Sequence, residues 1–130
     1  MFEADLIPII CALLLGGTPE YRVAYDINEG QHSVRMDCLT SEHAIEIGLD
    51  DRRSSYDSVH QAIFYAHLTE RAPMVIMIDT NGVEDNAEFQ VRTVAQALDV
   101  DYRSYDLDFL IRWQMTSYLR NRYRQPALSN

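Results

Sequence analysis

An uninterrupted apolar run is the sequence feature that most constrains the fold of this chain. Residues 73–79 read Pro-Met-Val-Ile-Met-Ile-Asp, and the turn signal Asn81-Gly82 follows closely. A short apolar run bounded by turn residues is typical of a strand that is buried on both faces. Such a strand needs neighbouring strands and a covering layer on each side. The run therefore predicts an α/β fold in which a mixed β-sheet is flanked by helices.

The remaining segments predict the elements around this strand. Alternating apolar and polar residues mark strands, whereas apolar residues three or four positions apart mark helices. The further predicted strands are 20–27, 33–38, 43–48 and 100–105. The predicted helices are 2–15 (with a start near Asp5 or a kink at Pro8), 54–70, 85–97 and an Arg-rich helix at about 106–124. With 130 residues, 47% of them apolar, the chain fits one domain spanning residues 1–130.

Two of these helices carry apolar residues expected to face the core. Ser54-x-x-Asp57 has the form of a capping box, so the helix at 54–70 is expected to begin there. The residues expected in the core are Val59, Ile63 and Ala66 in this helix, and Phe89, Val94 and Leu98 in the helix at 85–97.

Two carboxylates stand on consecutive predicted strands. Asp37 leaves its strand opposite Val34 and Met36, and Glu46 leaves its strand opposite its apolar neighbours, because side chains alternate between faces with a period of two. A hairpin would bring both carboxylates onto one face. Two acidic oxygen ligands, completed by water and a substrate phosphate, are a common way to hold Mg²⁺ at a phosphodiester-cleaving site.

The order of these residues resembles the PD-(D/E)XK nuclease superfamily, and in particular a small bacterial and phage-borne branch of it. The matching segments are Arg35-x-Asp37-Cys-Leu-Thr, Ala44-Ile45-Glu46 and Gln61-x-x-x-Tyr65, and the resemblance covers roughly residues 2–105. It implies a restriction-endonuclease-like (PD-(D/E)XK) core.

The resemblance also implies a set of site residues. Asp37, Glu46 and the backbone carbonyl of Ile47 would hold Mg²⁺. Gln61 would position substrate or water, and Tyr65 would pack or hydrogen-bond beside the site. In the family the first helix contributes a Glu at the edge of the site, and Glu3 is the candidate by position; a solvated terminus is the alternative.

One departure from the family pattern concerns activity. The family's catalytic Lys stands two residues after the Glu, and that position here is Gly48; all eleven basic residues of the chain are Arg. Arg52 or Arg53 could supply a cation, but a guanidinium is a poor proton carrier. Two functions therefore stay open. One is a catalytically degenerate relative that works as a binding or structural component. The other is an active Mg²⁺-dependent DNA endonuclease or exonuclease that uses Asp37 and Glu46 with an Arg such as Arg52.

The net charge and its distribution along the chain limit the kinds of partner that the protein can bind. The net charge of −9 argues against a general nucleic-acid binder. Residues 103–130, however, hold five of the eleven Arg and only two of the twenty acidic residues. The helix bearing Arg112, Arg120, Arg122 and Arg124 could contact nucleic-acid phosphates, a protein partner or a second copy of the chain, or it could be a solvated helix end.

The two cysteines and the hydropathy of the chain indicate in which cellular compartment the protein is expected. Cys11 lies in an apolar run and Cys38 at a core-facing strand position, so both are expected to be buried thiols. The apolar run Leu6–Leu15 is too short to span a bilayer, and no basic residue precedes it. No membrane association is expected. The predicted location is the cytoplasm or the interior of a phage-type particle.

Overall fold

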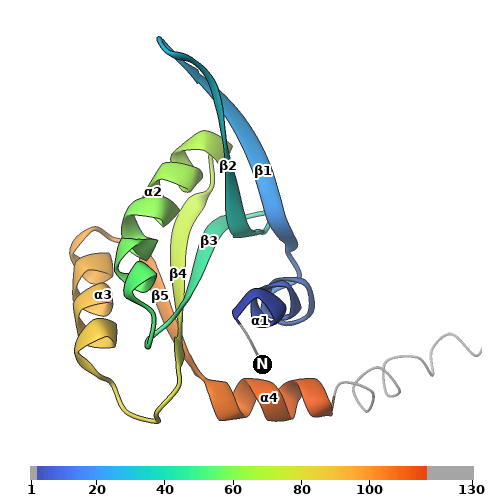
Figure 1. Cartoon of the computed structure of the whole chain (residues 1–130), viewed down its shortest axis with the longest axis vertical. Helices are drawn as coiled ribbons and strands as arrows, with labels where there is room; N and C mark the ends of the chain where they lie inside the picture. Colours follow the sequence, from blue (N-terminus) through green and yellow to red (C-terminus); the bar gives the residue numbers. More distant parts are fainter. Residues whose placement is uncertain (1–2, 117–130) are drawn as a thin grey trace, which may run out of the picture.

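A single five-stranded sheet organises the molecule. The computed structural model describes residues 3–116, with side chains from residue 6 onward. Figure 1 shows the long β1–β2 hairpin extending beyond the body of the sheet. The strands are β1 (Thr18–Ile27), β2 (Gly30–Leu39), β3 (His43–Leu49), β4 (Ala72–Asp79) and β5 (Asp101–Asp106).

The strand order confirms a mixed sheet. The strands lie in the order β1-β2-β3-β4-β5. β1, β2 and β3 pair antiparallel, whereas β3, β4 and β5 pair parallel. Residues 74–78 of β4 are at most 3% exposed, which agrees with the predicted strand buried on both faces.

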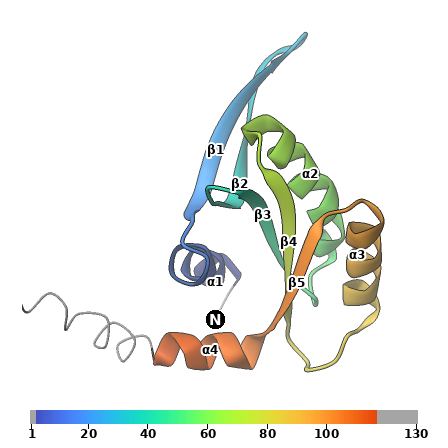
Figure 2. The same ribbon diagram turned by 180° about the vertical axis from the view of Figure 1, so that it is seen from behind.

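Helices cover both faces of the sheet (Figures 1 and 2). α2 (Ser58–Thr69) and α3 (Asn86–Ala97) lie on one face. α1 (Glu3–Ile9), a following π-helical turn (Ile10–Leu14) and α4 (Leu107–Met115) lie on the other. The core under α2 and α3 consists of Val59, Ala62, Val75, Met77, Val91, Ala95 and Val100. Within residues 3–116, no helix has the length and apolar character needed to cross a membrane.

The helix predicted at 54–70 begins later than expected. Arg53–Asp57 form a 3₁₀ turn, so α2 begins at Ser58 and the expected capping box at Ser54 is wrong. Ser55 is buried in this turn, where its hydroxyl donates to the carbonyl oxygen of Leu49 at 2.6 Å. The turn is therefore tied to the end of β3.

At the other end of the chain Arg112 is exposed on α4, while Arg120, Arg122 and Arg124 lie outside the described residues.

The two cysteines form a disulfide, which corrects the expectation of buried thiols. The Cα atoms of Cys11 and Cys38 are 5.4 Å apart, and both residues are fully buried. The bond arises because the π-helical turn packs against the end of β2, 27 residues further along the chain. Disulfides persist mainly in oxidising compartments, so the bond does not favour the cytoplasmic setting predicted from the sequence.

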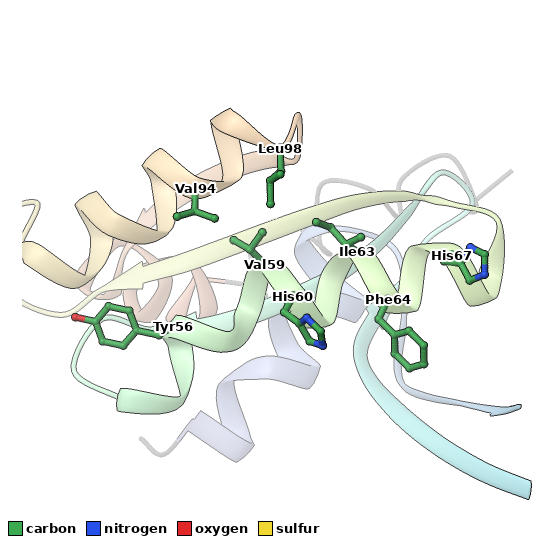
Figure 3. Close-up of a pocket in the computed structure, with 8 residues that line it drawn as sticks. All are labelled: Tyr56, Val59, His60, Ile63, Phe64, His67, Val94 and Leu98. Atoms are coloured by element: carbon green, nitrogen blue, oxygen red, sulfur yellow. The ribbon is translucent and has the colours of Figure 1, made fainter. Parts of the chain in front are cut away.

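Val59 and Ala66 of α2 are buried as predicted, but Ile63 and the three residues expected to face the core from the helix at 85–97 are not. Ile63 is 38% exposed, Val94 47% and Leu98 55%, and Phe89 is exposed as well. Small residues such as Ala62 and Ala95 contact the sheet instead. Figure 3 shows Val94 of α3 and Leu98, which directly follows α3, pointing toward α2, where they line an open apolar groove of about 570 Å³.

Candidate functional site

The candidate site forms where β2 and β3 separate. The two strands pair only at Cys38↔Ile45 and Leu39↔Ala44. At the next position along each strand, carboxylates take the place of the backbone ladder. The Glu46 Oε2 atom accepts a hydrogen bond from the Asp37 N–H at 2.9 Å, and the Asp37 Oδ2 atom accepts one from the Ile47 N–H at 2.9 Å. Each carboxylate is thus held in place by the backbone of the opposite strand.

Asp37 and Glu46 face one polar cavity of about 240 Å³. α2 contributes Gln61 and Tyr65 to the same cavity, so the strand pair and the helical pair predicted from the sequence come together. The complete lining is Arg35, Asp37, Glu46, Ile47, Gly48, Ser54, Ser55, Ser58, Gln61 and Tyr65.

Burial and charge shift the titration of this cluster. Desolvation raises the pKa of Glu46 from 4.5 to about 8, and the negative charge of Asp37 adds to the increase, while the hydrogen bond from the Asp37 backbone opposes it. Desolvation also raises the pKa of the Tyr65 hydroxyl, with the charges of Glu46 and Asp37 contributing. Tyr65 is therefore a neutral hydrogen-bond donor at physiological pH.

The donor set fits a hard divalent cation. Carboxylate oxygens are the ligands that Mg²⁺ prefers, and a cation between Asp37 and Glu46 would relieve the repulsion that adds to the effect of desolvation on the Glu46 pKa. Ile47 lines the same cavity, as the predicted backbone ligand requires. The cavity also has room for the water molecules that Mg²⁺ retains.

Position 48, where the PD-(D/E)XK resemblance would place a Lys, has no space for an added Cβ atom without a shift of its neighbours. A Cβ atom built on Gly48 would lie 2.5 Å from the Ser55 Oγ atom and 3.0 Å from the Ser55 Cβ atom. It would also lie 3.3 Å from the Ser58 Oγ atom. Both serines are buried, so they occupy the space into which a longer side chain would extend.

The structure does not bring Arg52 into the cavity. Its side chain is half exposed and its Nε atom lies 3.8 Å from the Asp51 Oδ1 atom. Arg35 lines the cavity instead, from the strand that carries Asp37. The sequence contains a signal for the position of Arg35, because residues 35 and 37 are two apart in a strand and therefore lie on the same face.

A second acidic cluster lies at the carboxyl edge of the parallel strands. Asp50, Asp85 and Glu88 each offer a carboxylate oxygen within 4.8 Å of the others. The sequence contains a partial signal, because β3, β4 and β5 end at or next to Asp50, Asp79 and Asp106, and ligands of parallel sheets gather at this edge. The role of Glu88 has no such signal, since it comes from the first turn of α3.

Comparisons of the chain with family models, with curated proteins and with solved structures found no match. The fold and the site define an α/β protein with a mixed five-stranded sheet and an acidic cavity between β2, β3 and α2. The expected role of Glu3 stays a prediction, because its side chain lies outside the part that the structure describes.

Proposed function

We propose that this chain is a catalytically degenerate relative of the PD-(D/E)XK nucleases that works as a binding or structural component. On this proposal its fold is restriction-endonuclease-like, and Asp37 and Glu46 retain a binding site for a divalent cation such as Mg²⁺. The observation that carries the proposal is the filled space beside Gly48: two carboxylates face one cavity, while Ser55 and Ser58 stand where a side chain at position 48 would begin.

The chemistry of cleavage explains why this space matters. Charge develops on the phosphate oxygens in the transition state, and a fixed cation beside them is among the largest contributions to the rate. The serine hydroxyls beside Gly48 carry no charge. The cavity can therefore hold a cation and orient a phosphate or carboxylate group through Gln61 and the neutral Tyr65 without driving bond cleavage.

An active Mg²⁺-dependent nuclease is the second candidate, and the position of Arg35 favours it. Arg35 lines the cavity, and its guanidinium could stabilise charge on a bound phosphate. The Arg35 side chain is 55% exposed, and its Nη1 atom lies 4.0 Å from the Glu20 Oε1 atom. Part of its charge is therefore directed away from the cavity. On this alternative Asp37 and Glu46 hold the metal, and Arg35 replaces Lys in place of the Arg52 predicted from the sequence.

Metal binding and cleavage should be measured on the same protein. We expect Mg²⁺ or Mn²⁺ to raise the melting temperature of the wild type, and Asp37→Asn together with Glu46→Gln to remove the component of the shift that belongs to this cavity. We expect no cleavage of single- or double-stranded DNA by the wild type in either metal.

The two candidates separate in the cleavage assay. Metal-dependent cleavage by the wild type that disappears in Asp37→Asn and in Arg35→Ala, but not in Arg52→Ala, would establish the active alternative. Arg52→Ala is the matched control, because it removes an Arg that lies outside the cavity.

A further inference from the structure

We propose that Asp50, Asp85 and Glu88 form a second binding site for a divalent cation, separate from the cavity of Asp37 and Glu46. The site joins the end of β3 to the start of α3. Its occupant is a hard cation of the Ca²⁺ or Mg²⁺ type, bound by carboxylate oxygens.

The spacing of the three carboxylates suits one ion. One oxygen from each residue lies within 4.8 Å of the other two. Two oxygens on opposite sides of a Ca²⁺ ion are separated by at most about 5 Å, because each lies about 2.3–2.6 Å from the metal. A single ion can therefore contact all three residues.

Two buried atoms of the cluster have no hydrogen-bond partner when both carboxyl groups are ionised. Asp50 is 6% exposed and Glu88 is 3% exposed. The Asp50 Oδ2 and Glu88 Oε1 atoms are both buried, and neither receives a hydrogen bond in this form. A proton on Glu88 allows a hydrogen bond between Glu88 and Asp50, which helps to raise the Glu88 pKa. A bound cation would replace that proton and remove the cost of burying both carboxylates.

Hydrogen bonds to one carboxylate oxygen of Asp50 and one of Asp85 hold these two side chains in position. The Asp50 Oδ1 atom accepts hydrogen bonds from the backbone N–H and the hydroxyl of Thr80, at 3.1 and 2.6 Å. The Asp85 Oδ1 atom accepts the Glu88 N–H at 3.0 Å as the N-cap of α3. These bonds fix two of the three side chains before any ion arrives, which is the preorganisation that a binding site needs.

Among residues 3–116, no ion pair neutralises Asp50, Asp85 or Glu88. Arg92 is the only basic residue of α3, and its guanidinium binds the carboxylate of Glu84 through two hydrogen bonds of 2.7 and 2.9 Å. Asp79, whose charge reaches Glu88, adds further negative potential. The field around the cluster therefore attracts a cation rather than an anion.

Calorimetric titration of the full chain, stripped with EDTA and dialysed, tests the site. CaCl₂, MgCl₂ and MnCl₂ are titrated separately into Asp37→Asn/Glu46→Gln protein, in which the other cavity is disabled. We expect saturable binding of about one ion, and at least a tenfold loss of affinity when Glu88→Gln or Asp85→Asn is added. Asn is itself a good N-cap, so Asp85→Asn keeps the start of α3 while removing one charge.

Glu84→Gln is the matched control, since it removes an exposed carboxylate from the same region. We expect it to change the affinity less than twofold. Absence of saturable binding of all three cations to the Asp37→Asn/Glu46→Gln protein overturns the proposal, and so does binding that Glu88→Gln and Asp85→Asn leave unchanged. Neither result bears on the Asp37–Glu46 cavity, whose metal binding is measured in the wild type.

Discussion

Gly48 is the residue at which a missing side chain determines what the cavity can hold. We predict that Gly48→Ala lowers the free energy of unfolding by about 1–3 kcal/mol, because the added methyl group meets the buried Ser55 at 2.5–3.0 Å. Gly48→Lys should cost more, since its Cβ atom meets the same serines, and on the proposed function it should not produce DNA cleavage. Chemical denaturation followed by circular dichroism measures the change.

Ser55→Gly provides the control for this clash. If the contact with Ser55 causes the loss, Gly48→Ala should cost less in a Ser55→Gly background than in the wild type. An equal cost in both backgrounds would contradict the explanation. Ser55→Gly has its own cost through the lost hydrogen bond to Leu49, so only the difference between the backgrounds is informative.

At the scale of the element, helical periodicity identified Val59 and Ala66 on the buried face of α2 but wrongly included Ile63. We predict that Ile63→Ala lowers the free energy of unfolding by less than about 1 kcal/mol, because Ile63 is 38% exposed in the groove of Figure 3. Ile76→Ala is the matched substitution in β4, where Ile76 is fully buried, and it should cost about 2–5 kcal/mol. Urea denaturation of both variants makes the comparison, and equal costs would show that the groove is closed in solution.

At the scale of the whole molecule, two buried acids should make stability depend on pH. The pKa values of Glu46 and Glu88 are both raised from 4.5 to about 8, chiefly by desolvation. The native state therefore retains protons that the unfolded chain releases between these values. Stability should fall as pH rises from about 4.5 and level off above about 8.

Melting temperatures between pH 5 and 9 in EDTA measure this effect. Glu46→Gln and Glu88→Gln should each flatten the decline, because an amide cannot titrate. Glu84→Gln should leave the slope unchanged, since Arg92 lowers the pKa of Glu84 and keeps it ionised throughout this range. A wild type whose stability does not fall between pH 5 and 8 would show that neither Glu46 nor Glu88 is held protonated by the fold. Added Mg²⁺ should reduce the decline that belongs to Glu46, because a cation beside Asp37 favours the charged form.

The sequence by itself determined the elements and their order. Residues only a few positions apart form the patterns that predicted these elements, so local sequence was sufficient. These patterns are the apolar run of β4, the alternation of apolar and polar residues in β1–β3, and the turn residues between elements. The same local rule placed Asp37 and Glu46 on facing strands, and a helical spacing of four carried Gln61 and Tyr65 to the same cavity.

Only the tertiary structure decided what depends on contacts between distant segments. Cys11 meets Cys38 because a helical turn packs on a strand 27 residues away. Ser55 closes the space at Gly48 through a 3₁₀ turn that the capping pattern had assigned to helix. Glu88 joins Asp50 from the start of α3, and nothing in either segment alone indicates that they meet. Local sequence sets which face a residue takes, but the packing of whole elements sets which residue it meets there.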